Sequence, residues 1–170
     1  QICGQNLISN GNFETPPFAP PPSPVTNWVI SGTGHATSIA EGATTPSHSL
    51  ALNVGNNSQG TIVSQSFPTT SGQIYVLDFD SGIFGQPTGT LQLNVQVNGS
   101  GNLINQTVTP PVANSFSAAS IIFQHYHYIF VANSSTTTLQ FSDLGLNNGS
   151  ADTLVDSVVV SPTSPSPSPK

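Results

Sequence analysis

The stretch at residues 90–108 constrains the fold more than any other part of the chain. It reads TLQLNVQV, then NGSGN, then LINQTV. Every second residue of the first run is apolar, and Gln or Asn fills the positions between, which is the period of a half-buried strand. The Asn- and Gly-rich residues that follow are typical of a hairpin turn. The stretch therefore predicts an antiparallel hairpin whose first strand buries Leu91, Leu93, Val95 and Val97.

Similar short runs recur along the whole chain, separated by clusters of Gly, Asn, Pro and Ser, and none has a helical period of useful length. About eleven short strands with hairpin turns predict an all-β fold, an antiparallel two-sheet β-sandwich of the jelly-roll type. The expected strands are residues 6–9, 27–31, 35–40, 49–54, 60–67, 73–81, 90–97, 103–109, 121–132, 137–142 and 153–161.

Two Pro-rich segments interrupt this pattern, TPPFAPPPSP at 15–24 and SPTSPSPSPK at 161–170. Because proline has no backbone N–H, both are expected to be extended and polyproline-like rather than strands. With 170 residues the chain is most simply one domain. We expect an N-terminal segment at 1–5 with the lone Cys3, a sandwich at 6–160 that contains the first Pro-rich loop, and a Ser/Pro tail.

The charge content excludes some functions. Only 5 % of the residues are charged, seven acids and one base, where about a quarter is typical. A chain whose one basic residue is Lys170 offers nothing to phosphate backbones, so we expect no nucleic-acid binding. No apolar run approaches the about 18 residues of a membrane span, so no membrane insertion is expected. The start at Gln1 rather than Met suits a processed, secreted, extracellular protein.

Several residues are candidates for modification. The Asn-x-Ser/Thr pattern marks N-glycosylation candidates at Asn56, Asn98, Asn105, Asn133 and Asn148, all but Asn105 in predicted turns. Alternating Ser and Pro resembles hydroxyproline-rich cell-wall glycoproteins, which suggests hydroxylation or O-glycosylation of Pro162, Pro165, Pro167, Pro169, Ser164, Ser166 and Ser168. In a secreted protein the single Cys3 is either a link to another chain or an unpaired thiol.

Few side chains suggest chemistry. His125 and His127 lie two apart in HYHY, which places them on one strand face as half of a metal site or as plain solvent-facing imidazoles. Together with Tyr126 they are also the candidates for contact with a sugar. Asp78 and Asp80 form a carboxylate pair of the kind that glycosidases use, but we interpret them as solubilising acids. With no nucleophile motif and no internal basic residue, we expect no enzymatic activity.

Motifs at both ends carry a family resemblance. The opening NLISNGNFETPP, Trp28 in NWVISG, GQIYVLDFD and the closing TLVDSVVV resemble, in order, galactose-binding-like β-sandwiches over about residues 6–160. Such domains occur in carbohydrate-binding modules and in plant cell-wall proteins known as a domain of unknown function. The plant members carry paired cysteines, whereas this chain has Cys3 alone.

The resemblance implies that Trp28 lies in the core. It also implies a structural Ca²⁺ shared by the first and last strands, with Asn12, Glu14 and Asp156 as the matching residues. The alternative is that Asp156 caps a turn and Glu14 is solvated. No other cofactor is expected.

Two functions remain open. The first is a secreted, glycosylated structural subunit of a wall, matrix or filament, which binds copies of itself through its weakly charged surface and Pro-rich arms. The alternative is a carbohydrate-binding module that recognises cell-wall polysaccharide.

Overall fold

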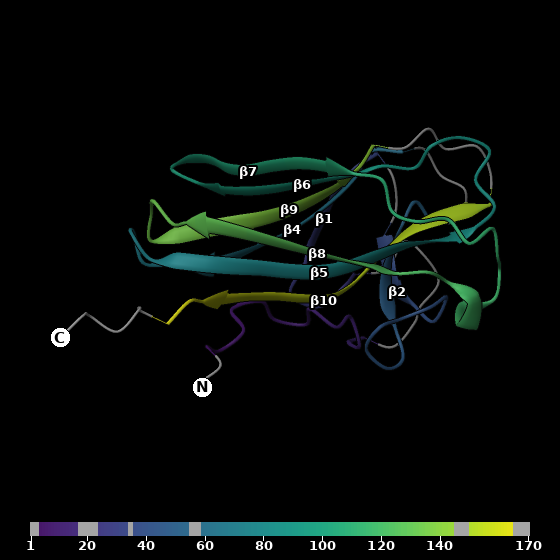
Figure 1. Ribbon diagram of the computed structural model, residues 1–170, viewed down its shortest axis with the longest axis horizontal. Helices are drawn as coiled ribbons and strands as arrows, with labels where there is room; N and C mark the ends of the chain where they lie inside the picture. The colour runs from purple at the N-terminus through teal and green to yellow at the C-terminus, as the bar shows by residue number, and fades with distance from the viewer. Residues whose placement is uncertain (1–3, 17–23, 34–35, 55–58, 145–149, 165–170) are drawn as a thin grey trace.

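The protein is a sandwich of two five-stranded antiparallel sheets in the computed structural model, which describes residues 4–16, 24–33, 36–54, 59–144 and 150–164 (Figure 1). The first sheet has the strand order β1–β4–β9–β6–β7, and the second has the order β2–β3–β10–β5–β8. The predicted all-β class and two-sheet sandwich are confirmed.

The chain crosses between the two sheets repeatedly, except that β2 is followed by β3 in the second sheet and β6 by β7 in the first. The first sheet contains β1 (Val29–Gly32), β4 (Thr61–Pro68), β6 (Leu93–Gly99), β7 (Gly101–Val108) and β9 (Thr136–Asp143). The second contains β2 (Ala36–Ile39), β3 (Ser49–Leu52), β5 (Ile74–Gly85), β8 (Gln124–Val131) and β10 (Ala151–Pro162). The described residues add one 3₁₀ turn, Ala118–Ser120, before β8.

Ten of the eleven predicted strands coincide with an observed one, and the exception is 6–9. This segment runs beside β10 without forming a regular ladder. Leu7 N–H donates to the Val160 carbonyl at 2.8 Å, but the side chain of Asn6 bonds both Val158 and Val160. Side-chain amides thus replace backbone pairing, which explains why an alternating pattern did not become a strand.

The start of the predicted tail is also corrected. Ser161 and Pro162 belong to β10, where Pro162 pairs with Tyr75 of β5, and Thr163 N–H donates to the Ile74 carbonyl at 2.9 Å. On its other side β10 pairs with β3 only from Thr153 to Val155. Pro162 lies beyond these pairs, so no β3–β10 hydrogen bond is lost through its missing N–H.

Aromatic residues fill the core between the sheets. Trp28 is 6 % exposed, as the resemblance implies, and its ring lies 5.3 Å from Phe13 and 6.2 Å from Phe141. Phe79 of β5 meets Phe141 of β9 edge to face at 5.1 Å and so joins the two sheets.

The predicted hairpin is confirmed. β6 and β7 pair in antiparallel register, and the apolar side chains buried on the first run are Leu91, Leu93, Val95 and Val97.

Candidate functional site

The outer face of the first sheet is covered by uncharged polar side chains. They alternate along β4, β6, β7 and β9 with core residues such as Val63, Val95 and Leu139, so they point away from the sandwich. We call this surface the polar face. It comprises Ser64, Ser66, Asn94, Gln96, Asn98, Asn105, Thr107, Thr138, Gln140 and Ser142.

Strand register aligns the polar face in rows. Ser64 stands opposite Gln140, Gln140 opposite Gln96, and Gln96 opposite Asn105, so that one row crosses four strands. A second row runs through Ser142, Asn94 and Thr107. Neighbouring strands lie about 4.8 Å apart, so the first row presents polar groups at a regular spacing, whereas Asn94 and Ser142 of the second row are each only 8 % exposed.

Hydrogen bonds within the polar face hold several of these side chains in place. Asn94 Nδ2 donates to Asn105 Oδ1 at 2.8 Å and to Thr107 Oγ1 at 3.2 Å. The hydroxyls of Ser66 and Thr138 lie 2.7 Å apart. Within β4, β6, β7 and β9, no outward position carries a charged or aromatic residue. The face offers both hydrogen-bond donors and hydrogen-bond acceptors and carries no net charge.

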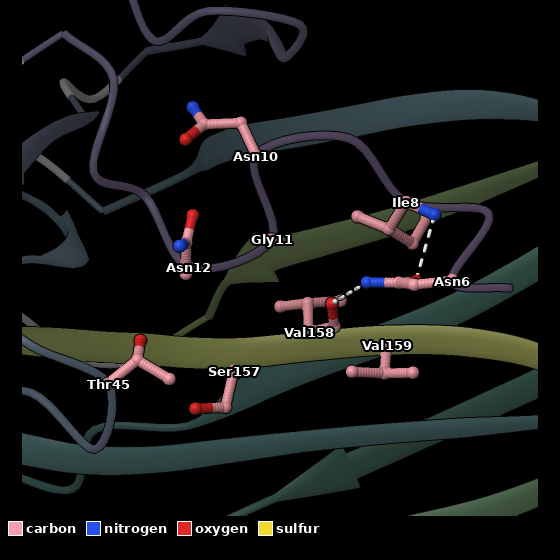
Figure 2. Close-up of a pocket in the computed structure, with 9 residues that line it drawn as sticks. All are labelled: Asn6, Ile8, Asn10, Gly11, Asn12, Thr45, Ser157, Val158 and Val159. Carbon is pink, nitrogen blue, oxygen red and sulfur yellow. Dashed lines mark hydrogen bonds between the residues drawn. The ribbon is translucent and has the colours of Figure 1, made fainter. Parts of the chain in front are cut away.

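A pocket of about 300 Å³ lies between residues 6–12 and the middle of β10 (Figure 2). Most of its amides serve the fold. Asn6 Nδ2 donates to the Val158 carbonyl at 3.2 Å, and Asn10 Nδ2 donates to the carbonyls of Thr15 and Thr26 at 2.6 and 2.9 Å. The amides of Asn6 and Asn10 therefore hold the N-terminal segment in place and are not free to bind a ligand.

The carboxylates proposed for calcium are bound by protein donors. Asp156 is fully buried, and its two oxygens accept hydrogen bonds from the backbone N–H groups of Thr44, Thr45 and Ser157 at 2.7 to 2.8 Å. The Glu14 carboxylate accepts from His48 N and Nδ1 at 2.8 and 3.0 Å. Calcium is bound by a shell of oxygen atoms. Here N–H groups point at both carboxylates, and an N–H group cannot be a calcium ligand.

Asn12, the third residue of the expected calcium set, is exposed on the rim of the pocket (Figure 2). In this arrangement the three residues do not fit a calcium site, and calcium stays a prediction without geometric support. The observed role of Asp156 is instead to anchor the connection between β2 and β3.

A second polar group, which we call the His/Asp cluster, lies on the outer face of the second sheet and comprises Asp78, Asp80, His125 and His127. Asp78 stands opposite His127, and Asp80 stands opposite His125, across the β5–β8 pair. His127 Nδ1 and His125 Nε2 lie 2.7 and 3.0 Å from Asp78 Oδ1, and His125 Nδ1 lies 2.7 Å from Asp80 Oδ1.

The hydrogen bond with Asp80 is the main reason that the pKa of His125 is raised, and burial opposes it only in part. The sequence predicted that Asp78 and Asp80 share one strand face and that His125 and His127 share another. It did not reveal that β5 and β8 are neighbours in this register, because nothing local links positions so far apart.

The structure does not bring Tyr126 together with the two histidines, and a sugar contact of any of the three stays a prediction. Tyr126 lies on the opposite face of β8, where its ring stacks on Phe79 with centroids 5.1 Å apart. Alternation along a strand makes this unavoidable, because adjacent residues point to opposite sides. Among the described residues, Phe116 has an exposed aromatic ring: it is 53 % exposed and contacts Phe84 edge to face at 5.7 Å.

A carboxyl pair that the sequence did not reveal joins Glu41 and Asp152. Burial raises the pKa of Asp152 to about 8, and the charge and hydrogen bond of Glu41 add to this effect. Burial also raises the pKa of Glu41. The two residues are far apart in the sequence, so only the fold brings them together.

Three of the candidate N-glycosylation residues are described. Asn98 lies in β6 rather than in the turn we predicted, because the strand continues to Gly99. Asn98 and Asn105 both belong to the polar face, whereas Asn133 is exposed in the β8–β9 connection and bonds the backbone of Ser100. Pro162 and Ser164 are described in and just after β10. The candidates outside the described residues are Cys3, Asn56, Asn148, Pro165, Ser166, Pro167, Ser168 and Pro169.

Comparisons with solved structures give the same fold. The chain is similar to the carbohydrate-binding module TmCBM61, solved in complex with β-1,4-galactotriose, with a TM-score of 0.68, 14 % identity, and coverage of 94 % of this chain and 99 % of that one. It is also similar to a family 4 carbohydrate-binding module, with a TM-score of 0.56, 18 % identity, and coverage of 92 % and 99 %.

The C-terminal family 22 carbohydrate-binding module of Clostridium thermocellum Xyn10B has a TM-score of 0.56 and 14 % identity, with coverage of 91 % and 96 %. Among the described residues, no helix has the length and apolar character that a membrane crossing requires.

No curated protein matches the chain in sequence. A family model does match it over residues 6–161, nearly the whole sandwich, and its description is "Protein of unknown function (DUF642)". The resemblance to the plant cell-wall domain of unknown function is confirmed, and the chain belongs to the DUF642 family.

Proposed function

We propose that the protein is a secreted, extracellular, non-enzymatic module that binds an uncharged cell-wall polysaccharide on the polar face. The observation that carries this proposal is the set of polar rows on the first sheet, uncharged and partly fixed by mutual hydrogen bonds. The likeness of the fold to carbohydrate-binding modules supports it.

The chemistry of the polar face suits sugar hydroxyls. Each hydroxyl both donates and accepts, and so do the amides of Gln96, Gln140 and Asn105. A surface without basic residues gives no advantage to acidic polysaccharides, so we propose a neutral chain as the ligand. Since the face has no aromatic ring on which a sugar can stack, we expect weak binding that is repeated along the polymer.

The proposal is tested by electrophoresis through gels that contain neutral galactan or xylan. The double variant Gln96→Ala with Gln140→Ala is expected to lose most of the retardation that the polysaccharide causes. Gln124→Ala is the matched control, because this exposed glutamine belongs to the second sheet. If Phe116→Ala removes the retardation and the double variant does not, the binding surface is the aromatic one and the proposal is wrong.

A second candidate function is self-association through the second sheet. Ile74, Ile129 and Val131 are 43 to 62 % exposed, and Ile74 stands directly opposite Val131. β8 is an edge strand, so its free backbone groups are also available to another chain. These features suit the structural subunit that the composition suggested.

Sedimentation velocity without added sugar tests self-association. The expected result for a structural subunit is a species larger than a monomer, which Ile129→Thr shifts towards the monomer. The control Val29→Thr changes an equally exposed residue of the first sheet. A monomer at all concentrations contradicts this second candidate and leaves the first untouched.

A further inference from the structure

We propose that the His/Asp cluster is a binding site for a divalent transition-metal ion such as Zn²⁺ or Cu²⁺, with Asp78, His125 and His127 as its ligands. This site is on the second sheet, away from the polar face, and does not depend on the proposed function.

The geometry brings three donor atoms together. One ligand atom from each of Asp78, His125 and His127 lies within 4.8 Å of the other two. Asp78 Oδ1 is 3.0 Å from His125 Nε2 and 2.7 Å from His127 Nδ1. At the usual bond lengths of about 2.0 to 2.1 Å, ligand atoms around a tetrahedral ion are about 3.3 Å apart. The two atom pairs that include Asp78 Oδ1 are therefore within a few tenths of an ångström of this spacing, and an ion would replace the protons that they share.

Asp80 completes the arrangement as a positioning residue. Its Oδ1 lies 2.7 Å from His125 Nδ1, so the proton of His125 is held on that nitrogen and Nε2 is left as the ligand atom. A carboxylate that holds the far nitrogen of a metal-bound histidine is a recurrent feature of zinc sites, where it fixes the ring and increases the basicity of the ligand. Asp80 is also less exposed than the histidines, with 17 % of its side chain accessible against 61 % for His125.

The donor set selects the class of metal. Two imidazoles and a carboxylate suit Zn²⁺, Cu²⁺ and Ni²⁺, whereas Ca²⁺ and Mg²⁺ prefer a shell made only of oxygens. Among these ions Cu²⁺ is expected to bind most tightly, in keeping with the general order of divalent affinities. Since His125 and His127 are more than half exposed, a fourth position faces solvent and can take a water molecule.

Among the described residues there is no Lys or Arg to compete for the cluster. The chain has one basic side chain apart from histidine, Lys170. Asp156 of β10 stands opposite Asp80, but its carboxylate accepts hydrogen bonds from Thr44 and Thr45 and takes no part in the cluster. The cluster therefore concentrates negative charge on Asp78 and Asp80. These two acids form ion pairs with His125 and His127.

Isothermal titration calorimetry with ZnCl₂ and with CuCl₂ tests the proposal. The protein is used with Cys3→Ser, because a thiol binds the same metals. We expect one ion per chain, and a loss of more than about 100-fold in affinity for Asp78→Asn and for His127→Gln, since direct ligands contribute more than the 10- to 100-fold typical of supporting residues. Asp80→Asn is expected to weaken binding roughly 10- to 100-fold.

His48→Gln is the matched control, because His48 pairs with Glu14 and lies outside the cluster. Electron paramagnetic resonance of the Cu²⁺ complex adds a readout that a structural role would not change, namely two nitrogen ligands in the parent protein and one in His127→Gln. Unfolding midpoints without metal show that each variant is folded, and His125→Gln replaces any variant that is not. Absence of saturable binding, or equal affinity in Asp78→Asn and the parent protein, overturns the proposal.

Discussion

The carboxyl group of Asp152 on β10 shares a hydrogen bond with that of Glu41 in the β2–β3 connection, and Asp152 is 9 % exposed. Burial and the neighbouring acid favour the protonated form of Asp152 in the folded state, with a pKa of about 8 against an ordinary 3.8. The folded state therefore holds a proton that the unfolded chain releases.

This relationship predicts that stability falls as the pH rises. Because the folded pKa of Asp152 is the higher one, its contribution is fully present below about pH 4 and is lost as the pH rises to about 8. Each pKa unit corresponds to about 1.4 kcal/mol, so urea titrations should show a loss of several kcal/mol over this range. Asp152→Asn should flatten most of the slope. Part of it should remain, because burial also raises the pKa of Glu41 and of Asp156, and the hydrogen bond with Asp80 raises the pKa of His125.

Glu14→Gln serves as the control. Burial raises the pKa of Glu14, but hydrogen bonds from His48 and Ser47 outweigh this effect and the pKa is lowered. The stability that the Glu14 carboxylate contributes is therefore lost at acidic pH. Glu14→Gln should leave unchanged the fall in stability that the parent protein shows as the pH rises to about 8. A protein that gains stability between pH 5 and 8 would show that Asp152 is ionised in the fold.

Asn10 is predicted to be the most sensitive polar residue of the N-terminal segment. Its side chain bonds Thr15 and Thr26, its carbonyl accepts from Trp28 Nε1 at 3.0 Å, and its φ of 51° favours Asn over most residues. Asn10→Ala should cost about 2 to 3 kcal/mol of unfolding free energy, measured by urea titration. Asn12→Ala, at an exposed neighbour, should change it by less than about 0.5 kcal/mol.

Glycosylation and polysaccharide binding should exclude each other on the polar face. A glycan on Asn98 or Asn105 would cover the rows that contain Gln96 and Gln140. Removing glycans enzymatically from native protein should therefore increase retention on neutral polysaccharide, and Asn105→Gln should reproduce that increase. Asn133→Gln should have no effect, because Asn133 lies in the β8–β9 connection. Full binding by protein that carries a glycan on Asn105 would place the ligand elsewhere.

Calcium should leave the stability unchanged. Five hydrogen bonds from Thr44, Thr45 and Ser157 fill the Asp156 carboxylate, so an ion would have to displace them. We expect the same unfolding midpoint in excess calcium chloride and in a calcium chelator. A midpoint several degrees higher with calcium, lost in Glu14→Gln, would restore the calcium site that the family resemblance implies.

The sequence predicted the parts of the fold that depend on local pattern. Alternation along residues 90–97 placed Leu93 and Val95 in the core, and the NGSGN turn placed β7 beside β6. The strand predicted at residues 6–9 failed because Asn6 and Gln65 satisfy its backbone through their side chains, which no alternating pattern reveals.

The sites depend on which strands become neighbours, and the sequence alone did not decide that. The sequence presented His125 and His127 as half of a metal site or as plain solvent-facing imidazoles, and Asp78 and Asp80 as solubilising acids, with nothing to connect the two pairs. Only the pairing of β5 with β8 joins them. The same holds for the polar face, since its rows exist only after four strands are placed in order and in register.

The way in which residues 6–11 lie along β10 also sets how the domain would yield to force. Leu7 bonds Val160 and Gly11 bonds Val158, so the two segments run in opposite directions and leave the sandwich at the same corner. Tension applied between residues 5 and 163 would load the bonds of Asn6 and Leu7 with β10 first and the Gly11–Val158 bond afterwards, one after another rather than together. Each is worth about 1 kcal/mol, so the first segment would peel away at low force while both sheets stay intact.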